Sequence, residues 1–391
     1  MSSYSILAAG MVNALGLDTE QIRSKLFLEN IKSPLRLSQQ YLPDCYLGAL
    51  PEVLGVIPSK FKELDSIYAR ILFHLYLQIE ASVTELKKIF GSDRIAVLIG
   101  TSTSGVDASE APFIQRAKTG NLPASYYFFN QEHGAGSKLI SSIAGVTGPS
   151  YSISTACTSS AKVFASAKNI LALDLADAVI LGGADSICAL TITGFKSLDL
   201  LSPEIANPMS VNRRGLNIGE GGALFTMVKS DMGVKLLGVG ESSDAHHLSA
   251  PDPLGAGAAA AMRSALSQAG ERKVKYINFH GTGTVLNDSM ESRATAEVLG
   301  EDVFCSSTKP LTGHLLGGCG AAEFGFCWLM LSQAGENKVL LPHLWDGQSD
   351  SNLPNLNLVR AGQMASFSKQ DLVLSNSFAF GGNNCSIALG L

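Results

Sequence analysis

Cys157 lies in the stretch SISTACTSSAKVFASA (152–167), between a β-prone run and a run of small, helix-permissive residues. This order predicts a strand, a sharp turn and a helix, with the sulfur beside the unpaired N–H groups of the first helical turn. The positive end of a helix favours a thiolate, which is the attacking form of cysteine. Because a cysteine in apolar surroundings is more often a small core residue, the local sequence leaves both interpretations open.

Two histidines lie in glycine- and threonine-rich turns, His280 in NFHGTGT (278–284) and His314 in TGHLLGGCG (312–320). Such turns hold a side chain at the end of a scaffold element and let the backbone approach a ligand closely. A single histidine is more often a hydrogen-bonded core residue than a catalytic one. Two such turns, together with a cysteine at a predicted strand–helix junction, favour a catalytic site.

Apolar strands that alternate with longer helices would position these three side chains. Continuously apolar runs predict strands buried on both faces, in sheets that are covered by helices. Strands are predicted at 94–102, 176–186, 274–284 and 371–382, and helices at 65–90, 157–172, 257–269 and 321–334. Residues 178–192 and 372–390 both read as strand, glycine-rich turn and strand, which predicts an α/β chain built from two related halves.

The composition of the 391 residues argues against several classes of protein. A formal net charge of −5, with no basic run longer than Arg213-Arg214, argues against a nucleic-acid partner. The chain has neither a run of 18 apolar residues nor a positively charged leader, which predicts no membrane insertion and no signal peptide. Seven scattered cysteines without a CxxC pair indicate reduced thiols in a cytoplasmic protein, without disulfides or a thiolate zinc site.

Eight motifs in order along the chain carry a family resemblance. They are GMVNALG (10–16), GPSYSISTACTSS (148–160), ILGGADS (180–186), NRRGLNIGEGGA (212–223), HGTGT (280–284), NDSME (287–291), STKPLTGH (307–314) and NSFAFGGNN (376–384). Together they resemble the β-ketoacyl-acyl carrier protein synthases, the elongating condensing enzymes. The resemblance implies a thiolase-like five-layered αβαβα fold of two halves, with the cysteine in residues 1–230 and both histidines in residues 231–391.

The resemblance also implies a decarboxylative Claisen condensation without a metal or cofactor. Cys157 would take an acyl group by thioester exchange, and His280 and His314 would donate N–H groups to the oxygen of a decarboxylating malonyl thioester. The backbone N–H groups of Cys157 and Phe380 would form the oxyanion hole of the acyl-transfer step.

The same resemblance implies residues that support His314 and His280. Lys309 and Glu323 would form a buried pair behind His314, with a surface salt bridge as the alternative. Asp288 and Glu291 would fix the loop of His280. Cys385 lies beyond the Gly-Gly turn on a predicted strand, which is the wrong position for the second catalytic cysteine of a thiolase.

Departures from the family pattern surround the predicted acyl pocket. The Arg-Asp-Gly-Phe pattern stands here as RRGL (213–216), so that Arg214 replaces an acid and Leu216 an aromatic residue. Phe378 and Phe380 remain as gating aromatics, and Thr103 lies in the altered turn TSTSG (101–105). This turn resembles the bacterial type II synthases that build aryl polyene pigments, so both fatty-acid and polyene or polyketide elongation stay open.

The predicted partners are acyl carrier protein, in acyl and malonyl forms, and a second synthase-like chain. Because carrier protein is acidic, a net-negative enzyme needs a local basic site, for which the candidates are Lys60, Lys62, Arg213 and Arg214. The strand PSYSIST (149–155) resembles the dimer-interface strand of the family, either in a homodimer or in a heterodimer with a chain-length factor. The alternative function is a non-catalytic subunit of the chain-length-factor type. Such subunits usually lack the cysteine.

Overall fold

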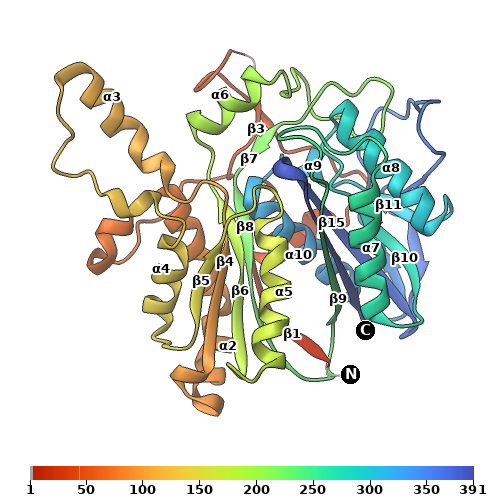
Figure 1. Ribbon diagram of the computed structural model, residues 1–391, viewed down its shortest axis with the longest axis horizontal. Coiled ribbons are helices and arrows are strands. Elements are labelled where there is room, and N and C mark those ends of the chain that lie inside the picture. The colour runs from red at the N-terminus through yellow and green to blue at the C-terminus, as the bar shows by residue number, and fades with distance from the viewer. Residues whose placement is uncertain (1–2, 44) are drawn as a thin grey trace.

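The computed structural model describes residues 3–43 and 45–391, and its centre is one large mixed sheet (Figure 1). Within the described residues this sheet has eleven strands. Their order across the sheet is β13 (Asn357–Leu358), β11 (Phe304–Ser306), β10 (Lys273–Asn278), β15 (Asp371–Ala379), β16 (Asn383–Gly390), β9 (Lys235–Ser243), β1 (Tyr4–Val12), β8 (Gly221–Lys229), β6 (Ala178–Asp185), β4 (Ile95–Gly100) and β5 (Ser150–Ile153).

The sheet consists of two halves with the same strand order. Apart from the two-residue strand β13, which the C-terminal half adds at its edge, each half has five strands; counted along the chain, their order is third, second, fourth, fifth and first, and the fifth strand runs antiparallel to both of its neighbours. The halves meet through a short pairing of β1 with β9. The predicted boundary after residue 230 falls in the connection from β8 to β9. This repeated order is the internal duplication that the sequence resemblance implies.

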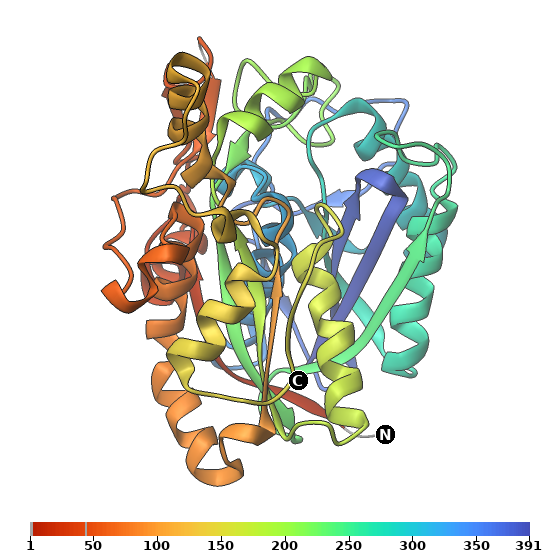
Figure 2. The same ribbon diagram turned by 60° about the vertical axis from the view of Figure 1, so that its left-hand side comes forward.

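Helices cover both outer faces of the sheet halves and fill the space between them, giving five layers (Figures 1 and 2). The outer layers are α2 (Ile67–Phe90) with α4 (Ala135–Ala144) on the N-terminal half, and α7 (Ala256–Ala269) with α8 (Val285–Leu299) on the C-terminal half. The middle layer is α5 (Ser159–Ala172) with α10 (Cys319–Leu331). Every residue of α10 except Trp328 is buried, as expected for a helix between two sheets.

Four of these helices, α2, α5, α7 and α10, lie where the sequence predicts helices. The predicted strands at 274–284 and 371–382 end earlier, at Asn278 and Ala379. Both are followed by glycines with positive φ, among them Gly283 at 79° and Gly381 at 77°. Because this backbone conformation cannot continue a strand, each run turns at the end of the sheet and presents its last residues as a loop.

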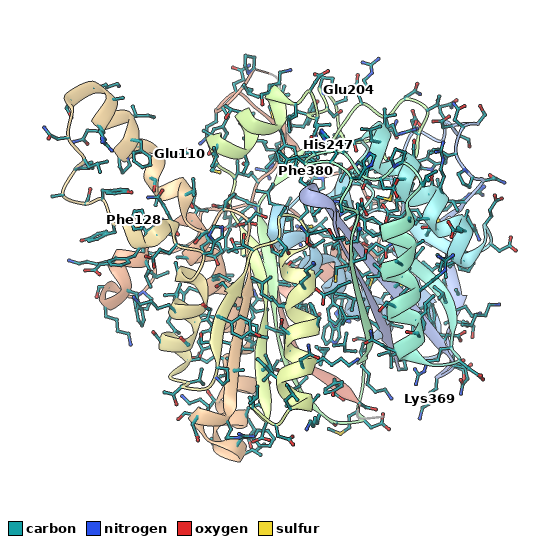
Figure 3. The ribbon with its side chains drawn as sticks, viewed as in Figure 1. Glu110, Phe128, Glu204, His247, Lys369 and Phe380 are labelled. Atoms are coloured by element: carbon teal, nitrogen blue, oxygen red, sulfur yellow. The ribbon has the colours of Figure 1, made fainter. Side chains whose placement is uncertain are left out.

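The shorter elements lie around this core. They are α1 (Thr19–Leu26), α3 (Glu110–Thr119), α6 (Ala189–Ser197), α9 (Lys309–Thr312), the small sheet of β2 (Arg36–Ser38), β3 (Cys45–Gly48) and β7 (Ile218–Gly219), and the pair of β12 (Asn337–Val339) and β14 (Met364–Ser366). Helix α3 projects from the body, and Phe128 lies on the same arm (Figure 3). Exposed apolar side chains on this arm are Phe113, Ile114, Phe128 and Phe129. Strand β5 is an edge of the large sheet, beside the arm.

No helix in the described ranges 3–43 and 45–391 combines the length and the apolar character that a membrane crossing requires.

Candidate active site

Cys157 lies at a strained turn between β5 and α5. Ala156 before it has φ +52°, a left-handed conformation that costs free energy for a residue with a Cβ. The Ser159 hydroxyl holds the turn, accepting from Thr155 N–H at 2.9 Å and donating to Ala156 O at 2.5 Å. Gly100 lets β4 approach this helix, since a Cβ there would lie 2.3 Å from Ser160 N. The turn therefore fixes the direction of the Cys157 side chain.

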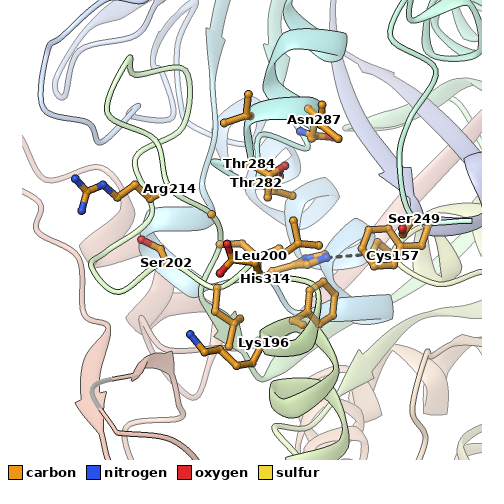
Figure 4. A pocket seen from close by; sticks show the side chains of 18 of the residues that line it. Cys157, Lys196, Leu200, Ser202, Arg214, Ser249, Thr282, Thr284, Asn287 and His314 are labelled. Carbon is orange, nitrogen blue, oxygen red and sulfur yellow. Dashed lines mark hydrogen bonds between the residues drawn. The ribbon is translucent and has the colours of Figure 1, made fainter. Parts of the chain in front are cut away.

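The sulfur of Cys157 contacts His314. Its Sγ lies 3.0 Å from His314 Nε2, as the dashed line in Figure 4 shows. Burial raises the pKa of the Cys157 thiol to about 12, although Lys309 and the N–H groups of Cys157 and Phe380 oppose this effect. The resting cysteine is therefore a thiol, and the helix terminus alone does not make it the thiolate that the sequence suggested. His314 Nε2 is placed to take the proton.

The loop of His280 is held by two buried carboxyl groups from α8. Glu291 accepts the N–H groups of His280 at 2.8 Å and of Gly281 at 2.7 Å, and Asp288 accepts Gly283 N–H at 3.2 Å. Burial raises the pKa of the Glu291 carboxyl to about 8. Both carboxyl groups thus lie at the loop-fixing positions that the resemblance implies. The rings of His280 and His314 meet edge to face, with centroids 5.2 Å apart.

Lys309 and Glu323 form a buried ion pair behind the histidines, so the alternative of a surface salt bridge is wrong. Lys309 Nζ also donates to His280 O at 2.8 Å. Burial opposes the charge on Lys309, but Glu323 outweighs it and raises the pKa of the ammonium. Burial first, and Lys309 second, hold the pKa values of His280 and His314 well below their usual value. Both imidazoles are therefore neutral and can donate N–H groups.

Phe380 opens the turn between β15 and β16. Its backbone N–H lies near enough to the sulfur of Cys157 to be among the groups that lower the pKa of the thiol. Its ring stacks on Phe195 of α6, with centroids 5.5 Å apart and planes inclined by 26°. Neither Phe195 nor Cys319 was predicted, because a residue within a helix carries no sequence signal of a distant partner. The Sγ of Cys319 lies 3.2 Å from Cys157 O.

A cavity of about 760 Å³ opens onto the three side chains of Cys157, His280 and His314 (Figure 4). Its walls include three of the predicted pocket residues, Leu216, Phe378 and Phe380. The fourth, Thr103, does not line it. Both its N–H and its hydroxyl bind Asp185, at 3.0 and 2.9 Å, so the structure corrects this prediction.

The four predicted carrier-binding residues differ in exposure. Lys60 and Lys62 are exposed on the short 3-10 helix Ser59–Leu64, and Arg214 is exposed at the wall of the cavity. Arg213 is only 7% exposed and pairs with Asp350 at 2.6 Å, so it cannot offer its charge to a docking protein. The prediction for Arg213 is therefore wrong, because the buried guanidinium serves an internal ion pair.

Two family models match the chain, and each matches a different segment of it. The N-terminal domain of beta-ketoacyl synthases matches residues 50–231, and the C-terminal domain matches residues 234–340. The chain belongs to the β-ketoacyl synthase family.

Individual relatives agree with this assignment. A 3-oxoacyl-[acyl-carrier-protein] synthase 2 of Coxiella burnetii is 32% identical over 318 residues, which cover 76% of this chain and 75% of the relative. Nodulation protein E of Rhizobium meliloti is 29% identical, over 75% of each chain. The solved complex of the ketosynthase ApeO with its chain length factor ApeC, from Xenorhabdus doucetiae, matches with a TM-score of 0.92 and 39% identity, covering 100% of this chain and 98% of that one. The chain thus has the thiolase-like fold of an acyltransferase family.

Proposed function

We propose that this β-ketoacyl synthase condenses an acyl group, held as a thioester on Cys157, with malonyl-acyl carrier protein. The observation that carries the proposal is the contact of 3.0 Å between Cys157 Sγ and His314 Nε2, at the end of a cavity that His280 also lines. A nucleophile with a proton acceptor, two neutral N–H donors and a backbone N–H aimed at the sulfur are the groups that this reaction needs.

In the first half-reaction the thiol of Cys157 is acylated. His314 Nε2 takes the thiol proton as sulfur attacks the thioester carbonyl of the acyl-carrier, because the thiol itself is protonated at rest. The N–H groups of Cys157 and Phe380 hold the oxyanion that forms. When the carbonyl re-forms, the carrier thiolate leaves and takes the proton back, so no net charge stays in the buried site.

In the second half-reaction malonyl-carrier loses carbon dioxide, and its two bonding electrons form an enolate. The N–H group of His280, and that of His314 once its ring proton lies on Nε2, stabilise the enolate oxygen; burial and Lys309 keep both rings neutral, so each ring carries one N–H. The enolate carbon then attacks the Cys157 thioester. The Cys157 C–S bond breaks, the cysteine leaves as a thiolate and takes a proton from water, and the 3-oxoacyl-carrier product departs.

We infer that the working unit includes a chain-length-factor subunit. ApeO, described in complex with such a factor, is 39% identical to this chain over its whole length. The free edge of β5 and the apolar arm around α3 give a second subunit a surface to cover. The pathway we favour is pigment or polyketide elongation. All seven cysteines are unpaired, which supports a cytoplasmic location.

Intact-mass spectrometry after incubation with acyl-carrier protein tests the assignment. The wild-type protein should gain one acyl group, Cys157→Ala none, and Cys385→Ala, which removes a buried thiol elsewhere, one. An acyl adduct on Cys157→Ala would overturn the nucleophile. Failure of Cys157 to react with a thiol-directed inhibitor of condensing enzymes, in the isolated protein and with its partner, would instead favour a non-catalytic subunit.

A further inference from the structure

We propose that Cys157, His280 and His314 bind one thiophilic divalent cation, such as zinc or cobalt, whenever the cysteine carries no acyl group. One ligand atom of each residue lies within 4.8 Å of the other two. Each side chain is more than nine-tenths buried, with exposed fractions of 6%, 2% and 1%. This proposal goes beyond the condensation reaction and does not depend on it.

The three ligand atoms, all within 4.8 Å of one another, can hold a small tetrahedral ion after small shifts of their side chains. Zinc bonds of about 2.3 Å to sulfur and 2.0–2.1 Å to nitrogen place neighbouring ligand atoms about 3.3–3.6 Å apart. The Sγ–Nε2 distance of 3.0 Å between Cys157 and His314 needs only a small expansion to admit the ion. Three protein ligands leave a fourth position for water, and the cavity of about 760 Å³ supplies it.

The protonation of the rings leaves them able to coordinate. A metal-ligating histidine needs a lone pair on the ligating nitrogen, and usually the second nitrogen is fixed by a partner. In the described residues neither His280 Nδ1 nor His314 Nδ1 has a hydrogen-bond partner. No hydrogen bond at Nδ1 therefore fixes either ring in one tautomer, so the ring proton can lie on Nδ1 and leave Nε2 free to coordinate, although no partner holds it there.

Binding exchanges a proton for the ion. The Cys157 S–H bond breaks, its proton passes to water, and a bond from sulfur to metal forms as the ion loses water molecules. The titratable groups that act on the trio are Lys309, which repels a cation, Glu323, which neutralises Lys309 in their ion pair, Asp185, which acts on Cys157, and Glu291, which binds the His280 N–H. The new thiolate compensates part of the charge of the ion. Since the sulfur cannot bind metal and acyl group together, the ion blocks acylation reversibly.

A competing trio shares one member with the first. His280, Cys319 and Glu323 also offer ligand atoms within 4.8 Å of one another. Glu323, however, is engaged by the ammonium of Lys309, which would lie beside a bound cation. The first trio also lines the cavity and the second does not, apart from His280. These differences favour Cys157 over Cys319 as the thiolate ligand, and they supply a matched control.

Titration of the reduced, chelator-treated protein with Co²⁺ tests the proposal by absorbance. We expect one equivalent to produce a thiolate-to-cobalt charge-transfer band and a four-coordinate ligand-field spectrum, both displaced by Zn²⁺. Cys157→Ala should lose the charge-transfer band, whereas Cys319→Ala should keep it. His314→Ala should weaken binding at least tenfold. An ion bound at the exposed His246 and His247 would give no thiolate band.

Wild-type protein alkylated at Cys157 is a control for variants that fail to fold, because it keeps the native sequence. It should lose the charge-transfer band. A band that persists after alkylation and in Cys157→Ala, or that disappears only in Cys319→Ala, would overturn the site. So would the absence of any charge-transfer band at millimolar Co²⁺. Acylation measured without metal is unaffected by any of these results, so the proposed condensation stands or falls separately.

Discussion

The two halves of the molecule share a strand order but place different chemistry at equivalent positions. In each half the third strand leads toward a helix of the middle layer, β5 to α5 and β11 to α10. Cys157 precedes the first of these helices and His314 precedes the second. The helices begin side by side, since Ser160 Oγ accepts Ala321 N–H at 2.9 Å. Duplication of one fold therefore brings the proposed nucleophile and its proposed proton acceptor together across the middle layer.

The connections from the fourth to the fifth strand differ more. In the C-terminal half this connection is the short turn Phe380–Gly382, whereas in the N-terminal half it runs from 186 to 220 and includes α6. The two meet where Phe380 stacks on Phe195. The long connection also carries Leu216 and Arg214 at the cavity wall. The C-terminal half thus supplies most of the catalytic groups, and the N-terminal half adds the nucleophile and much of the substrate wall.

Replacing the histidines should have the largest effect on the two proposed half-reactions. His280→Ala and His314→Ala should each lower malonyl decarboxylation about 10²–10³-fold, since each removes one donor to the enolate oxygen. His314→Ala should also slow acylation of Cys157 far more than His280→Ala, because only His314 contacts the sulfur. Release of labelled carbon dioxide measures decarboxylation, and intact mass measures acylation. Replacement of the exposed His247 by alanine is the control. Equal losses in acylation would contradict the assigned proton acceptor.

Lys309→Met should have the next largest effect, on stability. It leaves the Glu323 carboxylate buried without its cation, which should cost about 3–5 kcal/mol of unfolding free energy. The double variant Lys309→Met/Glu323→Gln should recover a large part of this loss, because it buries no uncompensated charge. Urea unfolding of the wild type, Lys309→Met and the double variant measures these changes in unfolding free energy. A double variant no more stable than Lys309→Met would show that Lys309 acts through its bond to His280 O instead.

The sequence could predict the elements and the three central residues, because buried strands, helical spacing and family motifs are local patterns. It could not predict the resting state of Cys157, since the proximity of a helix terminus is visible in the sequence and the burial that outweighs it is not. The predictions for Thr103 and Arg213 were wrong for a related reason. Both have the right residue type and place in the chain, but Asp185 and Asp350, distant in sequence, engage their polar groups.

Glu291 provides a pH-dependent test of the loop that the C-terminal half builds around His280. Its pKa is raised to about 8, so the folded state holds a proton that the unfolded chain releases near pH 4.5. The stability that this proton gives is fully present at low pH and is lost as pH rises through about 8. Glu291→Gln should therefore flatten the decline in unfolding free energy between about pH 5 and 8. A decline as steep as that of the wild type would contradict the buried, protonated carboxyl.

Phe195→Ala should have the smallest effect, at the one contact where the unequal connections of the two halves meet. Loss of an aromatic pair costs about 0.5–1.5 kcal/mol beyond its buried area, so acylation should slow by about tenfold or less. The loss should appear in the acylation rate and not in malonyl decarboxylation, because in the proposed mechanism the Phe380 N–H serves the oxyanion at Cys157, whereas the two histidines serve the enolate. Phe195→Tyr keeps the stacked ring and should keep the wild-type rate. If Phe195→Ala slowed both steps equally, the stacking would support the whole cavity rather than the oxyanion turn, and the short and long connections would not have separate roles.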